Sequence, residues 1–250
     1  MIHIFDDLEA LSEGAAELLT ELAARSTDEG RSFSVALSGG ETPRRTYELL
    51  ASSPHRGRIE WATIHVFWGD ERCVPSDHPA SNARMARESL LDHVPIPGEN
   101  VHLVQGAAPP SEASLLYERT LRRHFAGDTP RFDLVFLGMG EDGHTASLFP
   151  DAAVLDERRR LAVDVRAPGN GLPRITLTLP VFNSARNVCF LIAGEHKART
   201  LATVLEGPRR RASLPAQRVA PERGELRWYV DRAAASALEA SPRIVSSGNR

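Results

Sequence analysis

The sequence has few cysteines: Cys73 and Cys189 are the only two in 250 residues. They lie far apart and fit neither a disulfide framework nor the paired spacing of a zinc site. Their simplest interpretation is two reduced thiols, which is typical of a cytoplasmic protein.

Long apolar runs and an excess of one charge are also lacking. The start, MIHIFDDLEA, carries acids where a signal peptide needs a basic and then an apolar segment, and no stretch approaches membrane-spanning length. The 30 lysines and arginines nearly balance the 33 aspartates and glutamates, so no overall positive field attracts nucleic acid or an anionic membrane. We therefore expect a cytoplasmic protein with neither partner, in which any anion is bound by a local cluster.

Short apolar runs rich in β-branched residues alternate with segments of helical spacing. The runs cover 34–37, 63–68, 132–137, 161–165, 174–179 and 187–193, and helical spacing covers 8–25, 43–51, 81–91 and 111–125. Uninterrupted apolar runs suit strands that are covered on both faces, as in a parallel sheet. The sequence predicts an α/β fold with a doubly wound, largely parallel sheet flanked by helices.

No repeat or linker divides the chain. We expect residues 1–240 to form a single domain and residues 241–250 to form a flexible tail. The arginine-rich loop 206–215 is interpreted as mobile or exposed.

A glycine-rich turn joins the first clear strand to a helix in SVALSGGETPRRTYELL (34–50). Thr42 stands where a helix cap is expected and Pro43 where the first helical residue is expected. Glycines let backbone N–H groups approach a ligand and the helix start adds partial positive charge, so Ser38, Gly39, Gly40 and Thr42 form a candidate phosphate site.

Two other interpretations of this turn remain open. It is not a Walker turn, because no lysine follows, but an ordinary loop between strand and helix would also contain glycines. The order A-L-S-G-G (36–40) is close to the hydrolase elbow, which would make Ser38 a nucleophile.

A second turn, GMGEDG (138–143), matches the dinucleotide-binding pattern and is followed by His144. However, Pro150 interrupts the next segment early, and Glu141 and Asp142 would place carboxylates beside a pyrophosphate. We favour a turn whose glycines keep the backbone free of side chains, in which Asp142 restrains the loop and His144 projects over the carboxyl edge of the sheet. The other eight histidines are interpreted as packed or solvated residues.

Three charged residues, Asp70, Glu71 and Arg72, end a strand in FWGDERCVP (67–75). Alone they are compatible with a solvated strand end. Together with the two turns they become candidate site residues, because the carboxyl ends of parallel strands meet at one edge of a sheet.

These segments together resemble the 6-phosphogluconolactonase family. The resemblance rests on LSGGETP (37–43), WGDER (68–72), SNARMA (81–86), LGMGEDGHTASLFP (137–150), PRITLTLP (173–180) and GEHKA (194–198), which recur in family order. The ending WYVDRAAASAL (228–238) is also similar to that of the family.

The resemblance implies hydrolysis of 6-phosphoglucono-1,5-lactone to 6-phosphogluconate without a metal or organic cofactor. By the same resemblance His144 is the general base, and Arg72, Arg174 and Lys197 contact the anionic substrate together with the turn 38–42. Asp70 is expected to hold either Arg72 or a substrate hydroxyl. The expected partner is this small-molecule lactone, and the expected state is a monomer or small homo-oligomer.

Two alternatives stay open. The related glucosamine-6-phosphate deaminases share the fold and a D-G-H turn, but they carry a glutamate directly before the proline where this chain has Phe149. Losing that carboxylate removes an acid/base partner suited to ring opening, which argues against a deaminase. A non-catalytic sugar-phosphate sensor would keep the anion turn but would not need His144.

Overall fold

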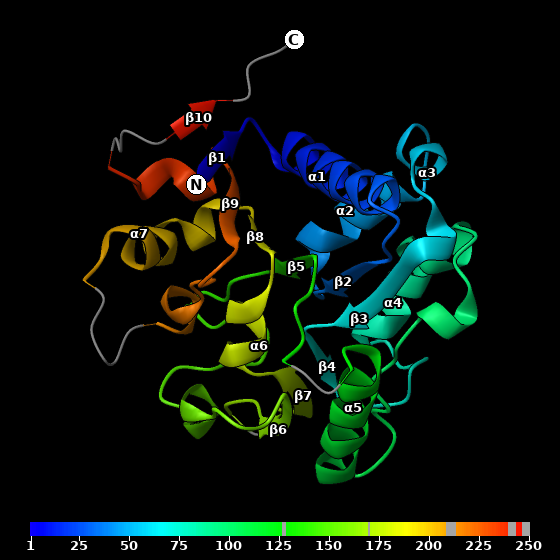
Figure 1. The fold of residues 1–250 in the computed structure, drawn as a ribbon. Coiled ribbons are helices and arrows are strands. Elements are labelled where there is room, and N and C mark those ends of the chain that lie inside the picture. Colours follow the sequence, from blue (N-terminus) through cyan, green and yellow to red (C-terminus); the bar gives the residue numbers. More distant parts are fainter. Residues whose placement is uncertain (127–128, 170, 209–213, 240–243, 247–250) are drawn as a thin grey trace.

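Ten strands and seven α-helices are present in the described part of the chain (Figure 1). The computed structural model describes residues 1–126, 129–169, 171–208, 214–239 and 244–246. The strands are β1 (Ile2–Phe5), β2 (Phe33–Leu37), β3 (Ile64–Trp68), β4 (Asp70–Arg72), β5 (Leu134–Leu137), β6 (Ala162–Arg166), β7 (Pro173–Leu177), β8 (Asn187–Ile192), β9 (Glu225–Asp231) and β10 (Ile244–Ser246). The helices are α1 (Leu8–Asp28), α2 (Glu41–Leu50), α3 (His55–Arg58), α4 (Asn82–Ser89), α5 (Pro110–His124), α6 (Leu179–Ser184) and α7 (Ala198–Glu206).

Seven of the strands form one parallel sheet in the order β10-β1-β9-β8-β5-β2-β3. The chain runs outward from β2 to the edge strand β3 and then returns to β5 on the other side of β2. The connections that leave β2 and β5 therefore run in opposite directions, and this is where open α/β sheets bind ligands. The predicted α/β fold with a largely parallel sheet is confirmed.

The central strands explain why the apolar runs were so clear in the sequence. Every residue of β2 and of β5 is buried, as expected for strands covered on both faces.

The long helix α1 begins where the Asp7 carboxylate accepts a hydrogen bond from Ala10 N–H, and it packs against α2 (Figure 1).

The two runs at 161–165 and 174–179 were predicted to join the parallel sheet, and this prediction is wrong. They contain β6 and β7, which form a separate antiparallel sheet in the order β4-β7-β6, at the end of the molecule away from both termini in Figure 1. After Ala162, half-buried Val163 and Val165 alternate with exposed Asp164 and Arg166, so much of one face of β6 is solvated. That pattern belongs to an antiparallel strand rather than to a doubly covered one.

Other predicted features also differ. Gly40, not Thr42, is the N-cap of α2, because the helix already begins at Glu41 and Pro43 is its third residue. The sequence did not predict strands β1 and β9. It also did not predict β10, which lies within the expected tail 241–250; the other residues of that tail lie outside the described ranges.

Part of the loop 206–215 also differs from its prediction. Residues 209–213 lie outside the described ranges, but Pro215 is buried and Leu214 is partly buried against the core. Among the described residues, no helix has the length and apolar character needed to cross a membrane.

Two buried tyrosines fix the ends of neighbouring strands. The Tyr47 hydroxyl accepts from Ser38 N–H at 3.0 Å and donates to Ser38 O at 2.9 Å. In the same way the Tyr117 hydroxyl bonds both Trp68 N–H and Trp68 O at 2.8 Å. Each hydroxyl satisfies a backbone donor and acceptor where the parallel ladder stops, so the loops that follow start from fixed positions.

We expect Tyr117→Phe to lower the free energy of unfolding by about 1–3 kcal/mol, because two buried backbone groups of Trp68 lose their partner. Urea denaturation measures the change. Tyr229→Phe is the matched control: its hydroxyl makes no hydrogen bond with the described residues, so the expected change is below about 0.5 kcal/mol. Equal effects of the two substitutions would contradict this role for Tyr117.

Candidate active site

A cavity of about 220 Å³ lies at the carboxyl ends of β2 and β5, where the direction of the connections changes. It is lined by Ser38, Gly39, Gly40, Asp70, Arg72, Asn82, Gly138, Met139, Gly140, His144, Ala146, Arg174 and Lys197. All of the predicted site residues except Asp142 and Thr42 are in this set. Five separate parts of the sequence, 38–40, 70–82, 138–146, 174 and 197, therefore meet in one cavity.

The turn after β2 offers a hydroxyl and a helix start. No side chain caps α2 at Gly40, whose φ of 112° favours glycine. The Ser38 amide is already bonded to Tyr47, but Ser38 Oγ is buried without a hydrogen-bond partner among the described residues. An unpartnered hydroxyl suits ligand binding, and it lacks the adjacent base that a serine nucleophile requires.

Asn82 is a site residue that the sequence reading missed. Its Nδ2 donates to Asp70 O at 2.8 Å, and its Oδ1 lies so close to Gly39 that a Cβ there would be 1.9 Å away. Gly39 is therefore required for close approach of the first turn to α4. The motif SNARMA, which starts α4 with Ser81 as its N-cap, was the available signal.

Glu71 is buried and holds β4 against the start of α4. Its carboxylate accepts from Asn82 N–H and Ala83 N–H, both at 2.7 Å, and from Ser81 Oγ at 2.9 Å. Burial raises the pKa of Glu71, although these hydrogen bonds oppose the shift. Glu71 thus positions its neighbours on either side, Asp70 and Arg72.

Arg72 and Arg174 lie directly opposite each other in the β4 and β7 pairing. Like charges in such a pair are unfavourable without a counterion. Arg72 donates to Ala80 O at 2.7 Å, but the Nε atoms of both arginines are buried and have no hydrogen-bond partner among the described residues. Burial lowers the pKa of Arg174, and the nearby Arg72 charge acts in the same direction. The arrangement favours an anion in the cavity.

The Asp70 carboxylate partly balances this charge. One oxygen accepts from Ser147 Oγ at 2.6 Å and lies 3.9 Å from Arg174 Nη1. The other accepts weakly from Asn82 Nδ2 at 3.4 Å. Of the two expected roles, contact with an arginine is present, but the arginine is Arg174 rather than Arg72.

His144 has a defined orientation. Its Nδ1 lies 2.5 Å from Asp142 Oδ1, and the same oxygen accepts from His144 N–H at 3.1 Å. Partial burial alone would raise the pKa of Asp142, but these hydrogen bonds outweigh it and hold the pKa below its ordinary value. Asp142 is therefore ionised at neutral pH and can only accept, so Nδ1 carries the proton and Nε2 carries the lone pair.

Several contacts hold the His144 turn in place. The Phe149 ring packs 5.0 Å from the imidazole centroid and 5.7 Å from the Arg174 guanidinium carbon. Ala216 N–H donates to Gly143 O at 3.1 Å, and the Leu214 side chain packs on Gly143, whose φ is 77°. The end of the loop 206–215 therefore supports the histidine turn, which the sequence did not indicate.

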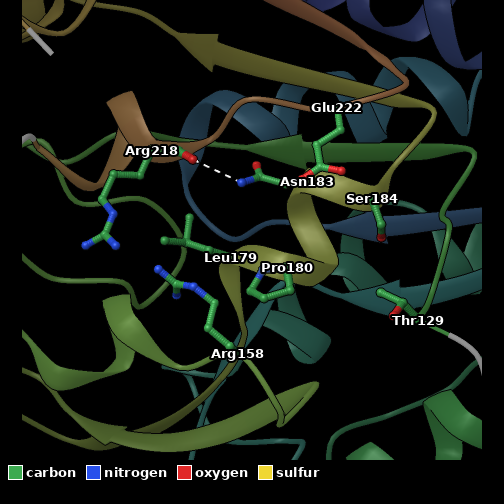
Figure 2. Close-up of a pocket in the computed structure, with 8 residues that line it drawn as sticks. All are labelled: Thr129, Arg158, Leu179, Pro180, Asn183, Ser184, Arg218 and Glu222. Atoms are coloured by element: carbon green, nitrogen blue, oxygen red, sulfur yellow. Dashed lines mark hydrogen bonds between the residues drawn. The ribbon is translucent and has the colours of Figure 1, made fainter.

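A second cavity, of about 520 Å³, is shown in Figure 2. Asn183 Nδ2 donates to Arg218 O there at 3.1 Å, and the Arg218 guanidinium is paired with Asp156 at 3.0 Å. The residues that line it are Thr129, Arg158, Leu179, Pro180, Asn183, Ser184, Arg218 and Glu222. This set contains no histidine or cysteine, so the smaller cavity with His144 is the better candidate.

Fold and site together define an α/β protein with a cationic cavity, suited to an anion, at the carboxyl edge of its parallel sheet and a histidine and aspartate pair beside it. Residues 6–228 match the family described as glucosamine-6-phosphate isomerases/6-phosphogluconolactonase. The chain belongs to this family.

Relatives of known name support the assignment. The chain is 42% identical to a 6-phosphogluconolactonase from Nostoc sp., over 95% of this chain and 98% of the relative. The structure of a 6-phosphogluconolactonase from Thermotoga maritima superposes with a TM-score of 0.80 at 33% identity, covering 93% of this chain and 99% of that one. A monomeric glucosamine-6-phosphate deaminase also superposes, with a TM-score of 0.78 at 21% identity over 94% and 99%, and this likeness shows the fold alone.

Two glycines of the histidine turn allow a test of its geometry. A Cβ on Gly140 would lie 2.0 Å from His144 Nδ1, whereas a Cβ on Gly138 would meet nothing within 4 Å. We expect Gly140→Ala to displace the ring and break its bond to Asp142, and Gly138→Ala to preserve it. Nitrogen and proton NMR of the histidine rings measures this as loss of the hydrogen-bonded Nδ1–H signal in Gly140→Ala only. Retention of that signal in Gly140→Ala would contradict the geometry.

Proposed function

We propose that this chain hydrolyses 6-phosphoglucono-1,5-lactone to 6-phosphogluconate, the second step of the oxidative pentose phosphate pathway. The observation that carries the proposal is that His144, with a free Nε2, shares one cavity with Arg72 and Arg174, whose Nε atoms lack partners among the described residues. A base beside a cationic cluster that Asp70 only partly neutralises suits hydrolysis of an anionic substrate.

The phosphate is bound at the start of α2 together with Lys197 and Arg174. Lys197 is the only lysine of the sequence, and it lines the cavity next to the start of α7. The uncapped first turn of α2 and the free Ser38 hydroxyl add donors of the kind that phosphate prefers. Binding this remote group orients the lactone ring toward His144.

The reaction begins with direct attack of water on the lactone carbonyl. Neutral His144 removes a proton from the water through Nε2, and Arg72 stabilises the negative charge that develops on the carbonyl oxygen. As the tetrahedral intermediate collapses, the ring C–O bond breaks and the imidazolium donates its proton to the departing ring oxygen. Asp142, which is held on Nδ1, stabilises the imidazolium and keeps Nε2 directed at the reaction.

Phe149 favours this function over deamination. It packs between His144 and Arg174 and places an apolar ring where the related deaminases have a carboxylate. Ring opening and isomerisation need an additional acid/base partner at this position, whereas lactone hydrolysis by water does not. A non-catalytic sensor would gain nothing from an oriented histidine and aspartate pair.

We expect His144→Ala to lose at least about a hundredfold in kcat/KM for lactone hydrolysis, since positioned proton transfer contributes about 10²–10⁴-fold. Lactone loss is followed at neutral pH with the spontaneous rate subtracted. His93→Ala serves as control, because His93 bonds only the Glu88 carbonyl on the surface. Near-normal turnover by His144→Ala would remove the base assignment, and ammonia release from glucosamine 6-phosphate would favour the deaminase.

We expect Lys197→Ala to raise KM by about tenfold or more with a smaller change in kcat, because the lost charge interaction acts on the remote phosphate. Arg199→Ala, which removes an exposed charge two residues away, is the matched control. Steady-state kinetics separate the two constants. An unchanged KM for Lys197→Ala would exclude this lysine from the phosphate site.

A further inference from the structure

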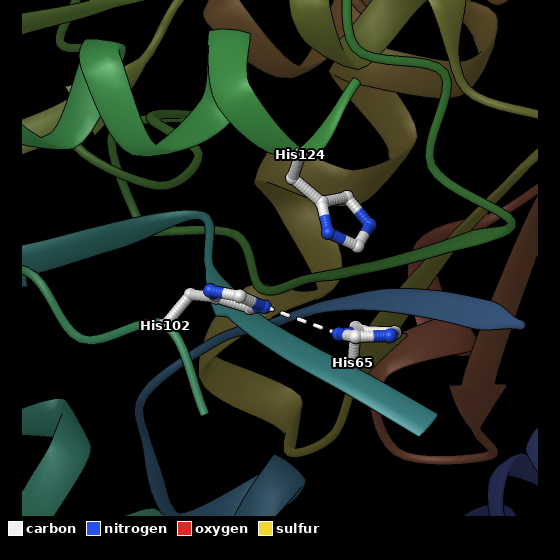
Figure 3. Close-up of side chains that lie close together, drawn as sticks. All are labelled: His65, His102 and His124. Atoms are coloured by element: carbon white, nitrogen blue, oxygen red, sulfur yellow. Dashed lines mark hydrogen bonds between the residues drawn. The ribbon is translucent and has the colours of Figure 1, made fainter. Parts of the chain in front are cut away.

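Three histidines from separate parts of the chain converge at one place (Figure 3). His65 is the second residue of β3, His102 follows the short bridge between Val66 and Val101, and His124 is the last residue of α5. One ring nitrogen from each lies within 4.8 Å of the others. The sequence did not predict this cluster, and each of the three histidines was interpreted as a packed or solvated residue.

Backbone contacts fix two of the three rings relative to each other. His102 N–H donates to Val66 O at 2.9 Å, so His102 is held beside the strand that carries His65. The two rings also share a hydrogen bond, in which His65 Nδ1 lies 3.2 Å from His102 Nε2 (Figure 3). Tetrahedral Zn²⁺ with Zn–N bonds of about 2.0–2.1 Å requires nitrogens about 3.3 Å apart, so this pair has the required spacing.

The third ring is available to complete the set. The centroid of His124 lies 4.6 Å from that of His65 and 5.2 Å from that of His102. Neither ring nitrogen of His124 makes a hydrogen bond with the described residues. One of its nitrogens lies within 4.8 Å of those of the other two rings.

Simple aromatic packing explains only part of the arrangement. Phe67 stacks on His102 at 4.2 Å and meets His124 edge-on at 5.0 Å, which accounts for contacts with the ring faces. Aromatic packing does not explain why one nitrogen of each histidine ring lies within 4.8 Å of the other two. Among the described residues, no carboxylate accepts a hydrogen bond from these three rings.

Burial makes protonation of the three rings unfavourable. Burial lowers the pKa of all three histidines, and for His102, where the charges of the other two rings act in the same direction, it reaches about 4. Neutral imidazoles are the form that binds transition metals.

We propose that His65, His102 and His124 form a binding site for Zn²⁺ or a similar divalent transition metal, with solvent as the fourth ligand. Three imidazole nitrogens with one open position are a common ligand set for Zn²⁺. The site lies at the beginning of β3, whereas the catalytic cavity lies beyond its end, so the metal ties the edge strand to α5 and takes no part in lactone chemistry. Binding to the folded chain alone raises its thermal stability.

The proposal is tested on the full chain after treatment with a chelator, by calorimetric titration with Zn²⁺ and no substrate. We expect one site per chain. His102→Phe and His124→Phe keep a ring in the aromatic cluster but remove one ligand, and each is expected to weaken binding by at least about a hundredfold. Zn²⁺ should raise the thermal midpoint of the wild-type chain and not that of either variant.

Two control variants locate the metal. His93→Ala and His144→Ala are expected to bind Zn²⁺ as the wild type does. Lactone turnover by metal-free His124→Phe should equal that of the metal-free wild type, which verifies that the variant is folded. The proposal is overturned if the wild type binds no Zn²⁺, if His124→Phe binds it equally well, or if His144→Ala is the variant that loses it.

Discussion

The hydrogen bond between His144 Nδ1 and Asp142 is the interaction on which the site depends. Because the ionised carboxylate can only accept, it decides which nitrogen keeps a lone pair for the cavity. The bond exists only because Gly140 has no side chain, since a Cβ there would overlap the imidazole. The absence of a side chain at one glycine therefore allows the hydrogen bond that orients His144.

The chemistry also requires two sheets rather than one. The parallel sheet supplies the histidine turn and the helix start, whereas the small antiparallel sheet supplies Arg72 and Arg174. Asp70 joins the two by accepting from Ser147, which follows the histidine turn. Because His144 and the two arginines come from different sheets, the distance between them is set by the packing of one sheet against the other. Phe149 contacts both the His144 ring and the Arg174 guanidinium.

The sequence predicted the features that depend on a local pattern of residues, namely the central strands and the motifs at their ends. Fully buried strands such as β2 and β5 read as continuous apolar runs, and the strand ends beside them carried the charged and glycine-rich motifs. The sequence did not predict that β6 and β7 form a separate sheet, because β7 pairs with β4, which lies far earlier in the chain. Asn82 and the support given by Ala216 were missed for the same reason: both act through contacts over a long sequence separation.

Histidine illustrates this limit most clearly, because one residue type occurs here in two opposite environments. His144 has a carboxylate on one nitrogen, which fixes the orientation of the ring and suits the base that we propose. His65, His102 and His124 pack against one another and against aromatic rings, and burial disfavours their protonation. For the two roles that we propose, the neighbours and not the residue type decide whether an imidazole is suited to act as a base or as a metal ligand.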